Sequence, residues 1–210
     1  MSKLSEPASA RWPIEKNGVA LPRSEFTFEQ RRTLLQIAHD AIVSFVESDS
    51  SGKSLSTTTP GVAGLDEPRG VFTTLYSDGN LRGCVGYAAA VMPLYRAVAE
   101  TARAAAFEDS RFSPVSREEA LKLEVSLSVL SRVVAIDPEA VEVGRDGLVI
   151  SMGNRRGLLL PQVPVEQGWN RETFLEQTCR KAGLPLDAWR RGAIVEAFTA
   201  EVFSDGDTGV

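Results

Sequence analysis

Histidine and cysteine are nearly absent from this chain, which contains one histidine, His39, and two cysteines, Cys84 and Cys179. Two cysteines are too few for a disulfide scaffold, although they would allow a single bridge. Free thiols in a reducing cytosol are the favoured state. One histidine and two widely separated cysteines also give no ligand cluster with the spacing of a zinc or iron site. We therefore predict no disulfide framework, no metal site and no cofactor.

Long apolar runs and an excess of positive charge are also lacking. No apolar run approaches the roughly 20 residues that a membrane-spanning helix needs, and residues 1–13 lack the apolar core of a signal peptide. The 23 basic and 28 acidic residues give a net charge of −5, which argues against a general nucleic-acid-binding surface. These absences predict a soluble, cytoplasmic protein that binds neither nucleic acid nor membrane.

Composition divides the chain into one domain and short flanking segments. Residues 1–23 contain three prolines and lack hydrophobic periodicity, so they are interpreted as an N-terminal arm. The domain is expected over residues 24–204 and is followed by a tail at 205–210. Within it, residues 48–67 are rich in Ser, Thr and Gly and predict a long flexible loop.

Helical and strand-like patterns alternate along the domain. Thr27 with Gln30 and Ser116 with Glu119 have the spacing of capping boxes, and Asn170 is a suitable N-cap. Short hairpins mixed with separate helices predict an α+β fold, in which helices flank a largely antiparallel sheet. The expected helices are 27–47, 93–107, 116–122 and 170–183, and the expected strands are 71–76, 81–87, 123–130, 147–152, 158–161 and 193–203.

The segment LRGCVG (81–86) forms the second strand of a predicted hairpin, after the turn SDGN (77–80). With a two-residue loop, Thr73 lies opposite Cys84 and shares its face with Leu75 and Arg82. A three-residue loop would shift this register by one residue and exchange the faces. The other face is then the expected core face, with Phe72, Tyr76, Leu81, Val85 and Tyr87.

Four segments together resemble one known family. They are LRGCVG (81–86), DSRFSPV (109–115), LEVSLSVLS (123–131) and GLLLPQVPVEQGW (157–169). They resemble the AMMECR domain family, which includes protein A of the AmmeMemoRadiSam system, and the likeness extends over about residues 28–203. The family usually has Asp-Pro-Arg-Phe where this chain has Asp-Ser-Arg-Phe, so a backbone-stiffening proline is replaced.

The resemblance implies a larger α+β part with an antiparallel sheet and a smaller second lobe. It implies no established reaction. Family members are associated with a Memo-like protein and a radical SAM protein, which implies a three-component modification pathway with these two partners.

Cys84 has two competing interpretations. As a nucleophile or acceptor it needs a lowered pKa, which Arg82 on the same face would supply. Gly83 and Gly86 would leave the backbone open to a ligand. Nothing in the sequence brings His39 to the thiol, however, so a Cys-His pair has no support. The alternative is a small buried cysteine, packed where glycines let another element approach.

The charged residues near the motif also allow two interpretations. Arg82 and Arg111, with Gln162 from the segment 157–169, would line a cleft for a small anionic ligand. Thr73 and Asp109 would complete this binding site. The alternative is an internal salt bridge from Asp109 to one of the two arginines, which fixes the loop to the sheet.

Three functions follow from these interpretations. The first is an accessory protein that binds a small anion or a partner segment at the LRGCVG groove. The second is an enzyme with Cys84 as nucleophile or acceptor and Arg82 as its electrostatic partner. The third is a structural adaptor in which the motif is a core hairpin alone.

Overall fold

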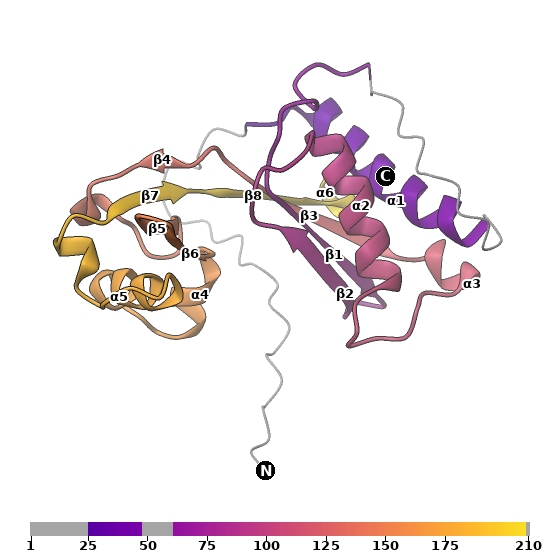
Figure 1. Cartoon of the computed structure of the whole chain (residues 1–210). Helices are drawn as coiled ribbons and strands as arrows, with labels where there is room; N and C mark the ends of the chain where they lie inside the picture. Colours follow the sequence, from indigo (N-terminus) through magenta and orange to yellow (C-terminus); the bar gives the residue numbers. More distant parts are fainter. Residues whose placement is uncertain (1–24, 48–60, 209–210) are drawn as a thin grey trace, which may run out of the picture.

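The computed structural model describes residues 25–47 and 61–208. The chain forms two lobes, each built on a four-stranded antiparallel sheet (Figure 1). This arrangement confirms the α+β fold with a smaller second lobe. The predicted arm at 1–23 and most of the predicted loop, 48–60, lie outside the described residues.

The larger lobe contains the sheet β2-β1-β3-β8, with α1 and α2 packed on one face. Its core is formed where apolar side chains of these helices meet the sheet, and includes Leu35, Val98 and Leu127, all 0% exposed. The elements are α1 (Phe28–Glu47), β1 (Val71–Ser77), β2 (Asn80–Tyr87), α2 (Leu94–Phe107), α3 (Arg117–Ala120), β3 (Glu124–Leu130), β8 (Ala200–Ser204) and α6 (Asp205–Thr208).

The smaller lobe contains the sheet β4-β7-β5-β6 and a separate core around Phe174, Leu148 and Ile150. Helix α5 covers this sheet and buries Phe174 against it. The elements are β4 (Val134–Ala135), the 3-10 turn η1 (Pro138–Ala140), β5 (Gly147–Met152), β6 (Arg155–Leu159), α4 (Gln162–Glu166), α5 (Arg171–Lys181), the 3-10 turn η2 (Ala188–Arg190) and β7 (Ile194–Phe198).

The predicted helix starts are confirmed by their hydrogen bonds. The Thr27 N–H donates to Gln30 Oε1 at 2.8 Å, and the Gln30 N–H donates to Thr27 Oγ1 at 3.2 Å. Both bonds of the Ser116–Glu119 capping box are present. Asn170 Oδ1 accepts from the N–H of Thr173 at 2.9 Å. Local sequence alone is therefore enough to begin α1, α3 and α5.

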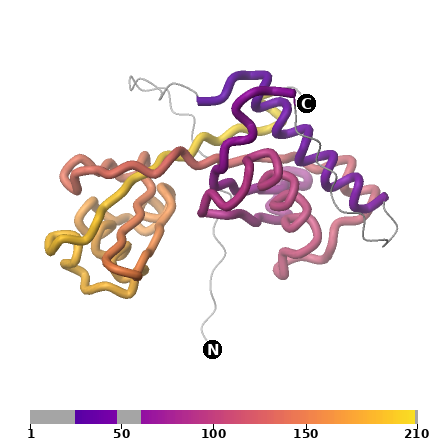
Figure 2. The backbone as a smooth tube through the Cα atoms, turned by 45° about the horizontal axis from the view of Figure 1, so that its top comes forward, coloured from indigo at the N-terminus to yellow at the C-terminus, as the bar shows by residue number. Residues whose placement is uncertain are grey.

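The predicted single strand at 193–203 is wrong, because it is divided between the two sheets. β7 ends at Phe198 in the smaller lobe, and β8 begins at Ala200 in the larger lobe. At the junction, Thr199 accepts from the Ser131 N–H at 2.8 Å and donates its own N–H to Ser131 Oγ at 2.9 Å. The two segments that join the lobes therefore run side by side, as Figure 2 shows. Residues 205–208, assigned to the tail by sequence, form α6.

The predicted hairpin register is also wrong beyond the turn. Tyr76 pairs with Leu81 as expected, but a bulge follows, and Leu75 then pairs with Gly83. Arg82 is the extra residue that the bulge leaves unpaired. The shift places Thr74, in place of Thr73, opposite Cys84.

This shift exchanges the two faces of β1, whereas Val85 and Tyr87 of β2 pack against the core as predicted. Val71, Thr73 and Leu75 are all 0% exposed and face the helices, so the expected core face with Phe72 and Tyr76 is wrong. We call the opposite side of the larger sheet the outer face. It carries half-buried residues of three strands, namely Phe72, Thr74, Tyr76, Cys84, Ser126 and Ser128.

Candidate functional site

The two glycines of LRGCVG lie where other parts of the chain come close. A Cβ at Gly83 would be 2.1 Å from the carbonyl oxygen of Ala105 in α2. A Cβ at Gly86 would be 2.3 Å from the ring of Phe72. Both distances are far below van der Waals contact, so the glycines allow a helix and an aromatic ring to pack on the strand. The space predicted for a ligand is occupied by the protein itself.

Cys84 lies on the outer face with its side chain half-buried. The Thr74 hydroxyl donates to its sulfur at 3.4 Å. Burial, and to a smaller degree the neighbouring Cys84, raises the pKa of Tyr76, which lies two residues from Thr74 on the same face. The thiol is therefore part of a small polar group with Thr74 and Tyr76.

The backbone of Cys84 is held by the loop that follows α2. Its N–H donates to Asp109 Oδ2 at 2.9 Å, and its carbonyl accepts from Arg111 Nη2 at 3.4 Å. β2 is an edge strand, whose outward backbone groups would otherwise be unpaired. The loop therefore closes this edge of the sheet at Cys84.

Asp109 and Arg111 form the internal salt bridge that the sequence allowed. Arg111 Nη2 lies 2.7 Å from Asp109 Oδ2, and Arg111 Nε donates to Oδ1 at 3.0 Å. The Asp109 side chain is 7% exposed. The hydrogen bond from Arg111, together with backbone N–H groups of Cys84 and Arg111, holds the pKa of Asp109 well below its usual range. The carboxylate is therefore charged and satisfied within the chain.

Arg82 is also held in a pair, but with Glu119 of α3. Its guanidinium bonds both carboxylate oxygens, with Nη2 at 3.1 Å from Oε2, and Nη2 also donates to the Ser113 carbonyl at 2.8 Å. The hydrogen bond from Arg82 lowers the pKa of Glu119. The positive charge predicted to activate Cys84 is therefore neutralised by a carboxylate that also caps α3.

Two other predicted site residues, Thr73 and Gln162, lie away from Cys84, and so does His39, as expected. Thr73 is on the helix-facing side, where its hydroxyl is 2.8 Å from that of Thr101. Gln162 begins α4 in the smaller lobe. His39 lies on α1, with Nε2 3.1 Å from both carboxylate oxygens of Asp205. The structure brings Cys84, Asp109 and Arg111 together, but not Thr73, Gln162 or His39.

Sequence reasoning missed Thr74, Tyr76 and Glu119. The first two were assigned to the wrong strand register or face. Glu119 was recognised as a capping residue, but its second role as the partner of Arg82 depends on a contact 37 residues away along the chain. Within the described residues, no group of three or more His, Cys, Asp or Glu side chains is placed to hold a metal ion. No helix of the described ranges is long and apolar enough to cross a bilayer.

These features define a two-lobed α+β protein in which an edge hairpin is fixed by its own charged loop. The model of the AMMECR1 family matches residues 35–203, and the chain belongs to this family. Protein MK0488 of Methanopyrus kandleri is 41% identical over 192 residues, which cover 86% of this chain and 91% of that protein. Protein MJ0810 of Methanocaldococcus jannaschii is 44% identical over 151 residues, or 67% of this chain and 75% of that protein.

A solved structure is also similar. The crystal structure of the uncharacterized protein PH0010 from Pyrococcus horikoshii matches with a TM-score of 0.62 and 40% sequence identity. The match covers 81% of this chain and 89% of that chain. Family and fold therefore agree with the resemblance drawn from the four sequence motifs.

Proposed function

We propose that this protein is an accessory protein that holds a segment of a partner protein on the outer face of its larger sheet. The partners are the Memo-like and radical SAM proteins that the family resemblance implies, and the setting is their modification pathway. The surface is centred on Cys84 and includes Thr74 and Tyr76.

The observation that carries the proposal is a contrast between paired charges and an exposed face. The charged groups around the motif are paired within the chain, since Arg82 pairs with Glu119 and Arg111 pairs with Asp109, and the remaining Arg82 Nη1 is buried. The outer face remains half-exposed and combines the Tyr76 ring with small polar groups, whereas the Phe72 ring packs against the hydrophobic cluster around Phe198. Aromatic side chains are enriched at protein-binding surfaces.

The same contrast disfavours a small anion at the motif. An anion would have to displace Glu119 or Asp109 from arginines that they hold through two or more bonds. The enzyme hypothesis has a separate difficulty, because a nucleophilic thiol needs a base or a free cation. His39 lies on α1, which packs against the helix-facing side of the sheet, and Arg82 is neutralised.

The experiment uses Cys84 as the attachment point of a photo-crosslinker. Cys179 is 0% exposed in α5, so benzophenone-4-maleimide should label Cys84 in the folded protein. Labelled protein is mixed with purified Memo-like or radical SAM protein from the same organism and irradiated. We expect a crosslinked heterodimer with one of them, and mass spectrometry would identify the bound segment.

A matched control places the label elsewhere. Leu121 is 72% exposed at the end of α3, and Leu121→Cys in a Cys84→Ser background carries the probe away from the outer face. This control should give no crosslink. Ser126→Arg, which puts a bulky charge on the outer face, should weaken partner binding, whereas Leu121→Arg should not. Equal crosslinking from both positions, or unchanged binding by Ser126→Arg, would refute the proposal.

A further inference from the structure

The two lobes are joined by two short stretches of chain that lie side by side. Residues 131–133 connect β3 to β4, and Thr199 connects β7 to β8. The Ser131 N–H donates to the Thr199 carbonyl at 2.8 Å, and the Thr199 N–H donates to Ser131 Oγ at 2.9 Å. A turn of the smaller lobe against the larger one therefore needs backbone changes at these few residues alone.

The strand pairing changes register at this point. In the larger sheet, Leu130 of β3 lies opposite Ala200 of β8. The same register would place Val134 opposite Glu196, but Val134 of β4 pairs with Ala197 of β7. The ladder is therefore interrupted between the two sheets, and an interruption of this kind is a place where paired strands bend.

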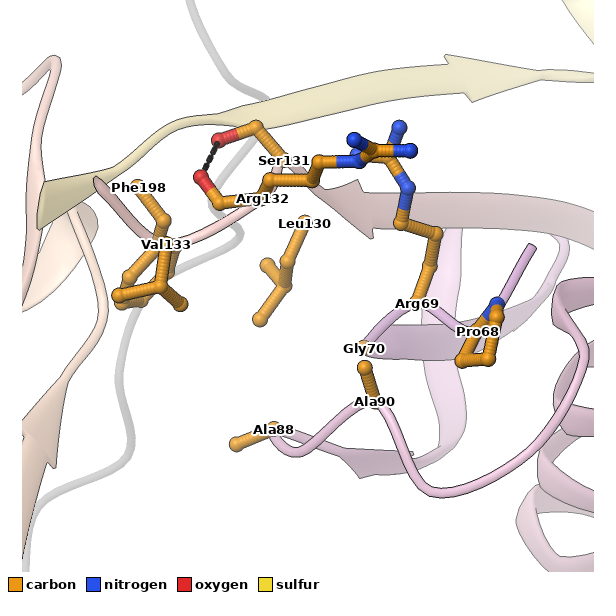
Figure 3. A pocket seen from close by; sticks show the side chains of 10 residues that line it. All are labelled: Pro68, Arg69, Gly70, Ala88, Ala90, Leu130, Ser131, Arg132, Val133 and Phe198. Atoms are coloured by element: carbon orange, nitrogen blue, oxygen red, sulfur yellow. Dashed lines mark hydrogen bonds between the residues drawn. The ribbon is translucent and has the colours of Figure 1, made fainter.

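A cavity of about 180 Å³ borders the two connections (Figure 3). Residues 130–133 and Phe198 line it from the connections, and residues 68–70, Ala88 and Ala90 line it from the larger lobe. Protein interiors are close-packed, and side chains beside a void lack packing partners on that side. The connections are therefore not fixed by close packing where they border the cavity.

The apolar contact between the lobes is a small cluster of its own. Its buried members are Leu130, Val149 and Phe198, and Phe72 of the larger sheet packs against it. The cores of the two lobes are separate clusters. Units that have their own cores and share a small interface are expected to move relative to each other.

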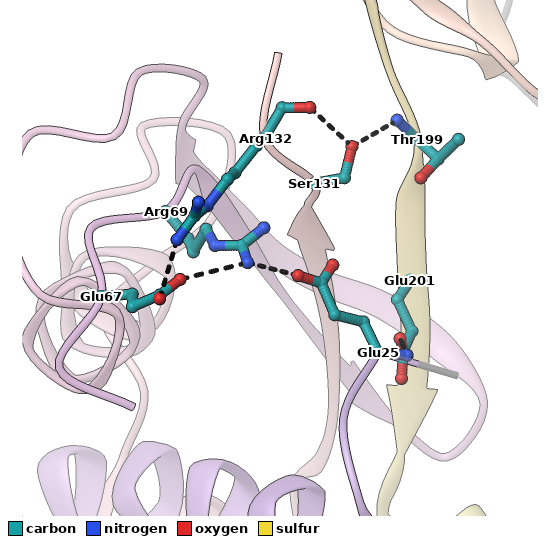
Figure 4. A network of polar contacts seen from close by, with 7 residues as sticks. All are labelled: Glu25, Glu67, Arg69, Ser131, Arg132, Thr199 and Glu201. Atoms are coloured by element: carbon teal, nitrogen blue, oxygen red, sulfur yellow. Dashed lines mark hydrogen bonds and ion pairs between the residues drawn. The ribbon is translucent and has the colours of Figure 1, made fainter. Parts of the chain in front are cut away.

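One ion pair ties the first connection to the larger lobe (Figure 4). Arg132 Nη2 donates to Glu67 Oε1 at 2.8 Å. Glu67 is anchored in the larger lobe, because its carbonyl accepts from the N–H of Leu94 in α2 at 3.0 Å. Its second carboxylate oxygen lies 3.3 Å from Nη2 of Arg69, whose side chain is 8% exposed. Glu67 is therefore the fixed partner, and Arg132 is the partner that moves with the connection.

This ion pair is charged but exposed. The hydrogen bond from Arg132, and to a smaller degree the charge of Arg69, holds the pKa of Glu67 below its usual range. The Arg132 side chain is 71% exposed and the Glu67 side chain 43%. Exposed ion pairs are individually weak and are screened by salt. The pair can therefore open and form again without disturbing either core.

We propose that residues 131–133 and Thr199 form a hinge on which the smaller lobe turns. The Arg132–Glu67 ion pair is the latch that favours the observed orientation. Turning the smaller lobe away uncovers Phe72, which lies on the outer face with Thr74. The hinge itself does not depend on the proposed function, whereas a larger partner surface after opening rests on it.

The test is a distance measurement between spin labels by pulsed electron–electron double resonance. In a Cys84→Ser background, Cys179 is 0% exposed and stays unlabelled. Leu121→Cys carries a label on the larger lobe and Val165→Cys a label on the smaller lobe, at positions that are 72% and 56% exposed. We expect one main distance and a minor second distance between the lobes at low salt.

Loss of the latch should raise the population of the second distance. Arg132→Gln should raise it by up to about fivefold, as expected for one exposed ion pair, and about 1 M NaCl should do the same in the parent. Arg132→Lys keeps the charge and should stay close to the parent. Arg117→Gln is the matched control, because Arg117 is 72% exposed and pairs with Glu47 within the larger lobe.

A label pair inside the larger lobe separates hinge motion from loosening of the fold. Leu121→Cys with Phe28→Cys, which is 61% exposed at the start of α1, should keep one distance in every variant and at every salt concentration. The proposal is overturned if the interlobe distances do not respond to Arg132→Gln or to salt. It is also overturned if Arg117→Gln acts like Arg132→Gln, or if the pair inside the larger lobe changes as well. None of these readouts uses a partner protein, so failure here leaves the crosslinking test of the outer face unaffected.

Discussion

Gly83→Ala tests whether the motif is built for the close approach of α2. The added Cβ would lie 2.1 Å from the carbonyl oxygen of Ala105 and 3.0 Å from its carbonyl carbon. Both atoms are backbone of a helix, so no side-chain rotation relieves the clash. Helix and strand would have to separate by more than an ångström, across an interface that includes Val98 and Ala102, both 0% exposed.

The expected cost is at the upper end of that for overpacking, about 3 kcal/mol. For a domain of this size, that corresponds to a melting temperature lower by about 6–12 °C. The assay is thermal unfolding followed by circular dichroism, with a urea titration as a second measure. Gly61→Ala is the control, because a Cβ there meets no described atom within 4 Å. Its free energy of unfolding should change by less than about 1 kcal/mol. If the melting temperature of Gly83→Ala were within about 2 °C of this control, the close packing of α2 on Gly83 would not contribute to the stability of the fold.

Three further predictions concern the same hairpin. Thr74→Cys should form a disulfide with Cys84 under mild oxidation, because the two residues lie directly opposite each other. Thr73→Cys should stay reduced, because its side chain lies on the other face of the sheet. A disulfide in Thr73→Cys and none in Thr74→Cys would contradict the bulge. Iodoacetamide should modify Cys84 in the folded protein but Cys179 only after unfolding, since Cys179 is fully buried and burial raises its pKa; equal rates in the native state would contradict this accessibility. Asp109→Asn should lower the melting temperature most near neutral pH. Because the pKa of Asp109 is depressed in the folded state, its stabilisation is present above the ordinary carboxyl pKa of about 3.9 and is lost as the pH falls below it. A difference between parent and variant that stayed constant down to about pH 2 would show that Asp109 does not stabilise through its charge.

Local signals in the sequence predicted most elements of the fold. The capping pair Thr27 and Gln30 began α1, and the N-cap Asn170 began α5, because these bonds form between residues three positions apart. The α+β class followed from the same signals. The two cores, by contrast, depend on which strands pair over long distances, and only the family resemblance indicated the second lobe.

The site was less predictable, because its geometry is set by distant contacts. The sequence pattern of the hairpin is compatible with regular strand pairing. In the structure a bulge leaves Arg82 unpaired in the sheet, and its side chain forms an ion pair with Glu119. That one displaced residue decides which side of the strand carries Cys84. The sequence also gives no sign that Arg69 and Arg132 form ion pairs with the same residue. Both bind Glu67 only in the folded chain.

The smaller lobe is an insertion between two strands of the larger sheet. β3 ends at Leu130, the chain then builds β4 to β7, and β8 returns to pair with β3 from Ala200 onward. A ribosome working from the N-terminus therefore delivers the whole smaller lobe before the strand that completes the larger one. The contact between β3 and β8 is of high contact order, and such pairings form slowly. Among the strand pairs of the described residues, this one joins the positions furthest apart in the sequence. Until β8 is released from the ribosome, the edge of β3 that it will cover stays open to any other strand.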